Sequence, residues 1–168
     1  MKALPFYLFA FLLFFVGCST IDCPVDSSVR TKYQIRDSYG QKLTLTDTIT
    51  IVSTRFDGKD TSLIDPTLYN KGVNISEFSI PISYTHPEDE LVFHFDNDNI
   101  DRHIVDTVWI KKEDYAHFES IDCNSAYFHN VTDVRYTRNY IDSLVINNPS
   151  VTYDSQTVHF YLYPKSNL

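Results

Sequence analysis

The sequence predicts an all-β protein, a single antiparallel β-sandwich, immunoglobulin-like or similar, with about eight strands. From Val29 onward, apolar residues recur at every second position, whereas the period of helices is nearly absent. Short runs rich in β-branched and aromatic residues alternate with turn-forming residues. Between Asp101 and Ser143 there are two alanines and no leucine, so we expect little or no helix. A closed β-barrel is the main alternative.

Pro81 and Asp47 each change what is predicted for the strand that contains them. Pro81 lacks a backbone donor, so its strand should lie at a sheet edge or contain a bulge. Asp47 falls on an apolar face, which predicts one strand with a local break or two short strands. Residues 57–74 should form a loop, and any helix should be a single turn around residues 112–117. The expected strands are 29–35, 43–51, 78–82, 91–95, 104–110, 127–136, 141–146 and 158–163.

The first eighteen residues, MKALPFYLFAFLLFFVGC, have the pattern of a secretory signal. Lys2 precedes a largely apolar run of fourteen residues, shorter than the about twenty that a spanning helix needs. Gly17 directly before Cys18 resembles the lipobox of bacterial lipoproteins. This resemblance implies a signal peptide at residues 1–17, cleavage after Gly17, and acylation of the Cys18 thiol and amino group. With Ser19 next, it also implies delivery to the outer membrane. The alternatives are an ordinary signal peptide with an unlipidated Cys18, or a retained signal anchor.

The remaining sequence divides into a lipidated cysteine with a short tether, residues 18–28, and one β-sandwich domain, residues 29–168. The formal net charge is −8, and removal of Lys2 with the signal peptide makes the chain more acidic. An acidic chain without a basic patch is a poor ligand for nucleic acid and is repelled by anionic lipid. We therefore expect no nucleic-acid partner, and membrane contact through the N-terminal lipid alone.

Two cysteines remain once Cys18 is lipidated. In an oxidising envelope this even number favours a Cys23–Cys123 disulfide. Such a bond would close a loop of about 100 residues and fix the tether to the far half of the domain. Neither cysteine has a His or another Cys at metal-ligand spacing, so we expect no metal site there.

A short motif, Asp-[Ser/Thr]-apolar-x-Ile, is repeated at residues 47–51, 106–110 and 142–146. One interpretation is strand entry, in which Asp ends a turn by bonding nearby backbone. The pattern also resembles the O-glycosylation signal of Bacteroidetes envelope proteins, which implies Thr48, Thr107 and Ser143 as acceptors. Both interpretations can hold at one site if the hydroxyl faces solvent.

Residues 96–101, DNDNID, are rich in calcium-type ligands but lack the Gly and Glu of an EF-hand loop, so a hairpin turn explains them better. Six histidines are scattered, and alternation should turn His94, His129 and His159 outward. Tyrosines crowd the last third of the chain, where they suit strand packing or an exposed binding platform. No catalytic motif occurs, so we expect no enzymatic activity, no cofactor and no metal.

The chain resembles a family of uncharacterised Bacteroidetes lipoproteins of unknown function. The shared features are the lipobox, a following cysteine, the Ile80-Pro81-Ile82 strand, the element Phe118–Cys123, and a C-terminal hairpin. This resemblance implies an envelope location and a β-rich fold, but no activity. We therefore expect a lipid-anchored cell-envelope protein that acts as a binding or structural module on an unknown envelope protein or glycan. The alternative is an accessory surface glycan-binding lipoprotein, which predicts a contiguous exposed aromatic patch.

Overall fold

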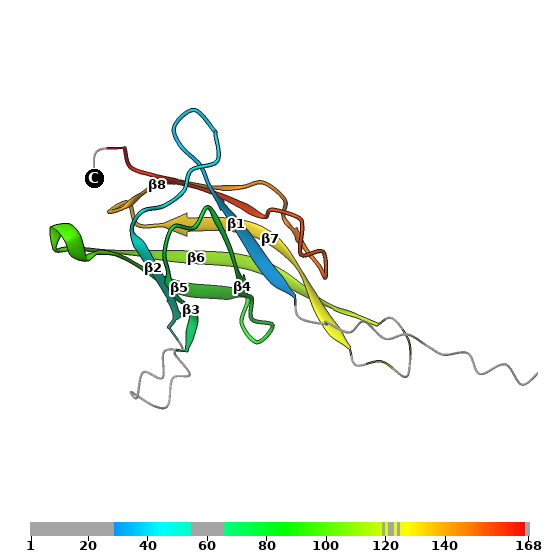
Figure 1. Cartoon of the computed structure of the whole chain (residues 1–168). Coiled ribbons are helices and arrows are strands. Elements are labelled where there is room, and N and C mark those ends of the chain that lie inside the picture. Colours follow the sequence, from blue (N-terminus) through cyan, green and yellow to red (C-terminus); the bar gives the residue numbers. More distant parts are fainter. Residues whose placement is uncertain (1–28, 55–65, 119, 121–122, 124, 167–168) are drawn as a thin grey trace, which may run out of the picture.

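The computed structural model describes residues 29–54, 66–118, 120, 123 and 125–166, which form two packed β-sheets (Figure 1). The only helix among the described residues is the short 3-10 turn η2 (Asp98–Ile100), between two long strands. The strands are β1 (Arg30–Ile35), β2 (Thr48–Ser53), β3 (Thr67–Gly72), β4 (Glu77–Pro81), β5 (Glu88–Asn97), β6 (Arg102–His117), β7 (Ala126–Tyr136), β8 (Ile141–Ile146), β9 (Ser150–Val151) and β10 (Phe160–Pro164).

One sheet has the strand order β4-β1-β10-β8, and the other has the order β3-β2-β5-β6-β7-β9. The expected all-β, two-sheet architecture is confirmed. Neighbouring strands are antiparallel except β1 and β10, which run parallel. The expectation of a fully antiparallel sandwich is therefore wrong at this pair. β1 and β10 are far apart in the sequence, so no hairpin dictates their relative direction.

The core consists of the alternate residues that face inward from both sheets. Tyr33 of β1 is fully buried and stacks between Phe78 and Phe160, with ring centroids 4.7 and 4.8 Å away. Phe93 of the opposite sheet meets the Tyr33 ring edge-on at 6.1 Å. Desolvation by burial raises the pKa of the Tyr33 hydroxyl well above its ordinary value. The aromatic enrichment of the sequence is thus used largely for packing.

The structure confirms one of the predictions for single segments and contradicts two others. Pro81 ends β4, which is an edge strand as the missing donor predicts. The predicted loop at residues 57–74 is wrong in part, because β3 occupies 67–72 and pairs with β2. The predicted helical turn at 112–117 is wrong, because these residues continue β6. In both cases cross-strand pairing overrides weak local signals.

The hairpin of β6 and β7 is the longest feature of the molecule. β5 pairs with β6 only as far as Lys111, so residues 112–117 pair with β7 alone. Figure 1 shows this end of the hairpin running past the other strands to the lower right. The start of β1 lies at the same end, because Arg30 is paired with Pro81, just before the β4–β5 connection. No helix in the described part of the chain has the length and apolarity needed to cross a membrane.

Candidate functional site

The motif Asp-[Ser/Thr]-apolar-x-Ile occurs three times, and its aspartates at positions 47 and 106 are buried and hydrogen-bonded within the fold. Asp47, at the entry to β2, is only 2 % exposed. Its carboxylate accepts hydrogen bonds of 2.6 Å from Asn97 Nδ2, the Arg102 guanidinium and the Tyr140 hydroxyl. Burial alone would raise the pKa of Asp47, but these bonds and the Arg102 charge together lower it. The same carboxylate helps to raise the pKa of Tyr140, after desolvation by burial, which is the larger cause.

Asp106, in β6, is equally buried and caps the connection between β7 and β8. Its carboxylate accepts from Thr137 Oγ1 at 2.6 Å, and from the backbone N–H groups of Asn139, Tyr140 and Ile141 at 2.8 Å each. The four donors satisfy both carboxylate oxygens, as a buried charge requires. Tyr140 thus connects the two motifs, because its backbone binds Asp106 and its hydroxyl binds Asp47.

The aspartate of the third copy of the motif, Asp142, is exposed and forms an ion pair with Arg138 at 3.0 Å. Asp47 directly precedes β2, as strand entry predicts, but Asp106 lies within β6. Both buried carboxylates bond residues distant in the sequence, so the predicted bonding of nearby backbone is wrong. The adjacent hydroxyl residues Thr48, Thr107 and Ser143 are all half-buried. The backbone N–H of Thr107 donates to Thr137 Oγ1 at 2.9 Å, so Thr107 is part of the Asp106 network. Glycosylation of the three residues stays a prediction.

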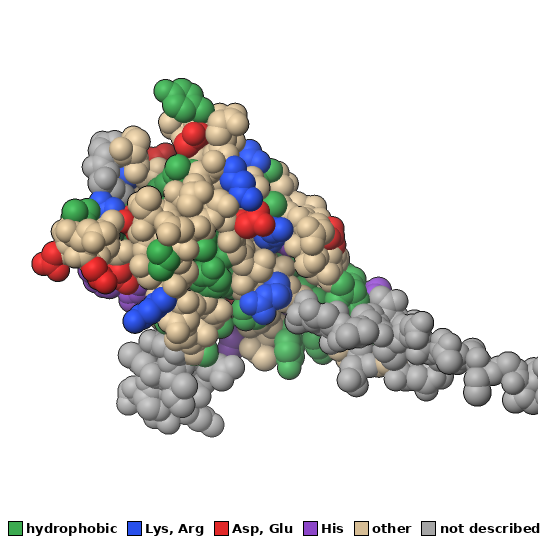
Figure 2. All heavy atoms as spheres, in the orientation of Figure 1, with side chains coloured by type: hydrophobic (Ala, Val, Ile, Leu, Met, Phe, Trp, Pro, Cys, Tyr) green, Lys and Arg blue, Asp and Glu red, His purple; other side chains and the backbone are tan. Residues whose placement is uncertain are grey.

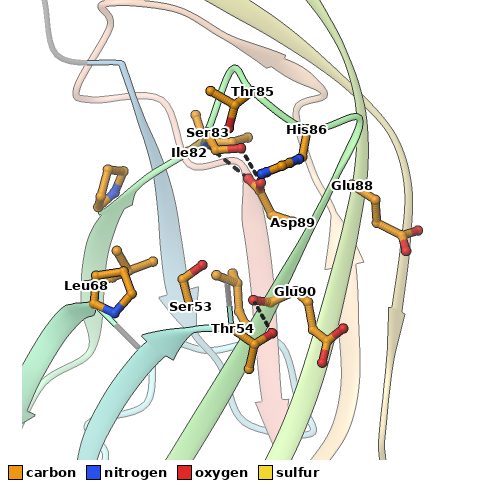
Figure 3. A pocket seen from close by; sticks show the side chains of 13 residues that line it. Ser53, Thr54, Leu68, Ile82, Ser83, Thr85, His86, Glu88, Asp89 and Glu90 are labelled. Atoms are coloured by element: carbon orange, nitrogen blue, oxygen red, sulfur yellow. Dashed lines mark hydrogen bonds between the residues drawn. The ribbon is translucent and has the colours of Figure 1, made fainter. Parts of the chain in front are cut away.

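A small pocket of about 160 Å³ opens between the two sheets, near the β4–β5 connection (Figure 3). Asp89 lies at its centre and accepts from Ser83 through the hydroxyl at 2.6 Å and the backbone N–H at 3.1 Å. The His86 ring lies beside Asp89 in Figure 3. The lining residues are Ser53, Thr54, Pro66, Leu68, Pro81, Ile82, Ser83, Thr85, His86, Glu88, Asp89, Glu90 and Leu91. The pocket therefore combines apolar walls with hydroxyl and carboxylate oxygens.

Behind the pocket, a buried lysine joins the charges of three strands. The side chain of Lys112 has no solvent exposure, and its ammonium lies 3.7 Å from Asp89 and 3.5 Å from Asp114. The ammonium also donates to the backbone oxygen of His86. Asp114 in turn contacts Nδ1 of His129 at 2.6 Å. A β-bulge between Lys111 and Lys112 accompanies this change from apolar core to charged network.

Two histidines contradict the outward orientation expected from alternation. His129 and His159 are each only 1 % exposed, whereas His94 is half-buried. His129 faces inward with Lys112 because the β-bulge shifts the register of the hairpin. His159 lies beside β1, where its Nδ1 accepts from the backbone N–H of Lys32 at 2.9 Å. Burial lowers the pKa of His159, so the ring is neutral at neutral pH.

Exposed aromatic residues gather at the far end of the β6–β7 hairpin. We define the aromatic end as Tyr84, Tyr115, Phe118 and Tyr127, which are 59 %, 47 %, 66 % and 38 % exposed. The rings of Tyr84 and Tyr127 stack at 4.6 Å and thus join the β4–β5 connection to the hairpin. Tyr115 meets Phe128 edge-on at 6.0 Å, and Phe128 also packs against His117 and Tyr153. Other hydrophobic side chains are scattered over the visible face of the molecule (Figure 2).

The sequence did not identify the aromatic end. Five of the tyrosines in the last third of the chain are buried or half-buried: Tyr136, Tyr140, Tyr153, Tyr161 and Tyr163. Tyr161, for example, is covered by the Arg36 guanidinium at 3.5 Å. The exposed set comes instead from three segments that only the fold brings together. Residues 112–118 carry no strand alternation, so the sequence held no signal for this set.

The remaining predicted site residues lie mostly outside the described part. Cys18 and Cys23 are not among the described residues, and Cys123 lies half-buried in the β6–β7 connection. Lipidation of Cys18 and the Cys23–Cys123 pairing therefore stay predictions. No group of three or more His, Cys, Asp or Glu residues suited to a metal ion occurs within the described ranges. The turn at residues 96–101 is the β5–β6 connection, in which Asp101 adopts a left-handed conformation with φ of 47°.

The two packed sheets, with a pocket at one end and an aromatic hairpin beside it, define a small β-sandwich protein. The chain belongs to a family of unknown function, DUF6452, which matches residues 48–164. That match covers β2 to β10 and omits β1, the strand that completes the smaller sheet. Comparison with curated proteins and with solved structures returned no match.

Proposed function

We propose that this protein is a lipid-anchored component of the bacterial cell envelope that acts as a non-enzymatic binding module. The observation that carries the binding role is the pocket around Asp89, flanked by the exposed aromatic end. Behind the pocket, the ammonium, carboxylate and imidazole groups of the buried network contact one another instead of facing open solvent. Lys112 and His129 are buried against Asp89 and Asp114. Such mutual pairing supports a binding role more than a catalytic one.

The anchor is the sequence MKALPFYLFAFLLFFVGC, with Cys18 as the acylated residue. An outer-membrane location follows from the resemblance to lipoproteins that carry Ser after the cysteine. Two or three acyl chains give stable attachment where a single chain does not. Mass spectrometry of the mature N-terminus from the native host should show cleavage after Gly17 and added acyl mass. A mature N-terminus that begins elsewhere than at Cys18, or that carries no acyl mass, would refute the anchor.

A second candidate function is glycan binding, and the composition of the pocket favours it. Sugar hydroxyls are bound by carboxylate and hydroxyl oxygens, which Asp89, Ser83 and Thr85 supply. A pocket of about 160 Å³ is smaller than typical drug-sized sites and suits one sugar ring. The aromatic end would supply stacking surfaces beside it.

The glycan candidate is tested by calorimetric titration with soluble envelope polysaccharide and its monosaccharides. Saturable binding that is lost in Thr85→Val and retained in Thr46→Val, an exposed threonine outside the pocket, supports it. Equal binding by both variants would count against the pocket as the sugar site. Intact mass of the native protein tests Thr48, Thr107 and Ser143 as glycosylation acceptors in the same preparation.

A further inference from the structure

The aromatic end carries solvent-facing rings on both strands of the hairpin, and the acidic residues Glu119 and Asp122 belong to the connecting sequence rather than to the described strand ends. Its described residues, 115–118 and 125–128, include no Lys, Arg, Asp or Glu. This is unusual in a chain whose formal net charge is −8. Tyrosine and histidine combine an apolar body with a polar tip, a combination enriched where membrane meets water. Tyr115 pairs with Phe128 and Tyr127 with Ala116, so the two tyrosine rings point to opposite faces, and both faces of this end of the hairpin carry exposed aromatic rings.

The path of the chain places this surface near the proposed lipid. β1 begins at the same end, because Arg30 pairs with Pro81 and Tyr84 follows in the adjoining connection. Ten residues lie between Cys18 and Val29, which makes eleven Cα–Cα steps, so the lipid lies within at most about 40 Å of the start of the domain. If Cys23 bonds Cys123, the limit becomes about 18 Å from the β6–β7 connection itself. The tether therefore joins the domain at the end that carries the aromatic rings, so this end can reach the bilayer more easily than the opposite end.

We propose that the aromatic end rests in the interfacial layer of the bilayer to which Cys18 is anchored, as a second, non-covalent membrane contact. This inference rests on the proposed lipid anchor. Tyr115, Phe118 and Tyr127 enter the headgroup region, and the Tyr84–Tyr127 stack keeps the β4–β5 connection beside it. The expectation of contact through the lipid alone considered only charge, and aromatic partition does not depend on a basic surface.

The contact should prefer neutral lipid. The connecting sequence contains Glu119 and Asp122, and the chain as a whole is acidic, so anionic headgroups would repel it. Binding should therefore be strongest on phosphatidylcholine vesicles and insensitive to salt, whereas an electrostatic contact would weaken as salt rises.

Depth-dependent quenching in phosphatidylcholine vesicles that contain brominated lipid tests the anchored state. The lipidated chain carries either Phe118→Trp, at the aromatic end, or Tyr39→Trp, an exposed residue in the β1–β2 connection. Trp109, the native tryptophan, contributes the same background fluorescence in both variants. We expect quenching at position 118 and little at position 39. Equal quenching at the two positions, or none at 118, overturns the inference. Flotation of the chain with vesicles reports the anchor separately, so failure of the anchor is distinguished from failure of the aromatic contact.

A second measurement does not require lipidation. The mature chain with Cys18→Ser is titrated with phosphatidylcholine vesicles, with and without Tyr115→Ser, Phe118→Ser and Tyr127→Ser. The matched control carries three exposed apolar residues of the opposite end changed to serine: Tyr39, Val73 and Ile100. We expect partition to fall about tenfold or more for the aromatic-end variant and to stay near wild type for the control. Equal partition of the two variants, or binding only to polysaccharide or an envelope protein, overturns the inference.

Discussion

Asp106 shows how one buried residue holds a connection in place. Its carboxylate binds Thr137 and three successive backbone N–H groups, so that the turn from β7 to β8 closes on β6. An amide in its place offers one acceptor oxygen, and its NH₂ group would face backbone donors. Buried donors without acceptors each cost about 1–3 kcal/mol. We expect Asp106→Asn to lower the free energy of unfolding by about 2–4 kcal/mol in urea titrations.

Asp142→Asn is the matched control for Asp106→Asn. It makes the same change in the same sequence motif, but Asp142 is exposed and pairs only with Arg138. Surface ion pairs contribute little, so the free energy of unfolding should change by less than about 1 kcal/mol. Similar losses in the two variants would contradict the role assigned to the Asp106 bonds.

Asp47 makes stability depend on pH. Its pKa in the folded protein is lower than its ordinary value, so the folded state binds fewer protons than the unfolded state as pH falls through that window. The stabilisation is therefore full above the unfolded pKa and is lost as pH drops through the folded pKa. We expect the free energy of unfolding to decline as pH falls through and below the ordinary aspartate pKa of 3.8, and Asp47→Asn to flatten this decline. Urea unfolding at a series of pH values measures both curves.

Tyr140→Phe separates the hydrogen bond to Asp47 from the aromatic packing. The ring of Tyr140 stacks on Phe95 at 3.9 Å, and phenylalanine preserves that contact. Loss of the hydroxyl removes one of the donors that hold the Asp47 pKa low, so the acid-induced decline should move to higher pH. An unchanged pH profile in Tyr140→Phe would show that Arg102 and Asn97 alone set the pKa.

At the scale of elements, Lys112 marks the place where the sandwich ends and the hairpin continues alone. Its ammonium is the cation between Asp89 on β5 and Asp114 on β6. Lys112→Met preserves the length of the stem but leaves both carboxylates without that charge. Removing one partner of a buried ion pair typically costs about 3–5 kcal/mol. We expect a loss of that order in the free energy of unfolding, measured by urea titration.

Lys111→Met, at the exposed neighbouring position, is the control and should change stability by about 0.5 kcal/mol or less. A small effect in both variants would mean that Asp89 and Asp114 are satisfied by Ser83 and His129 without the lysine.

The sequence predicted strands correctly where apolar and polar residues alternate over a long run. It did not predict structure that depends only on pairing between strands. The runs at residues 141–146 and 127–136 became β8 and β7 with little change. β3 was missed because its residues carry no strong alternation, and it forms only by pairing with β2. The inward turn of His129 depends on a bulge that shifts the β6–β7 register by one residue, and no local pattern marks that bulge.

The pocket and the aromatic end could not be predicted from the sequence for the same reason. The pocket requires β2, the β4–β5 connection and the start of β5 to meet, and these segments are distant in the sequence. The aromatic end needs Tyr84 to reach Tyr127 across the fold. By contrast, the predictions of a signal peptide, of Cys18 lipidation and of a cysteine pair depend only on local sequence, and they stay predictions because residues 1–28 lie outside the described part.

At the scale of the whole molecule, the predicted Cys23–Cys123 bond would connect the tether to the hairpin and stabilise the fold by closing a loop of about 100 residues, worth at most about 4.7 kcal/mol in the chain-entropy model. The mature chain with Cys18 acylated should react with iodoacetamide only after reduction. Cys23→Ser, Cys123→Ser and the double variant should each lower the urea midpoint by the same amount, because either change removes the whole bond. Single losses that add up in the double variant would show that the two cysteines act independently and are not paired. The double variant in vesicles should also weaken quenching at Phe118→Trp, since the bond shortens the path from the lipid to the aromatic end.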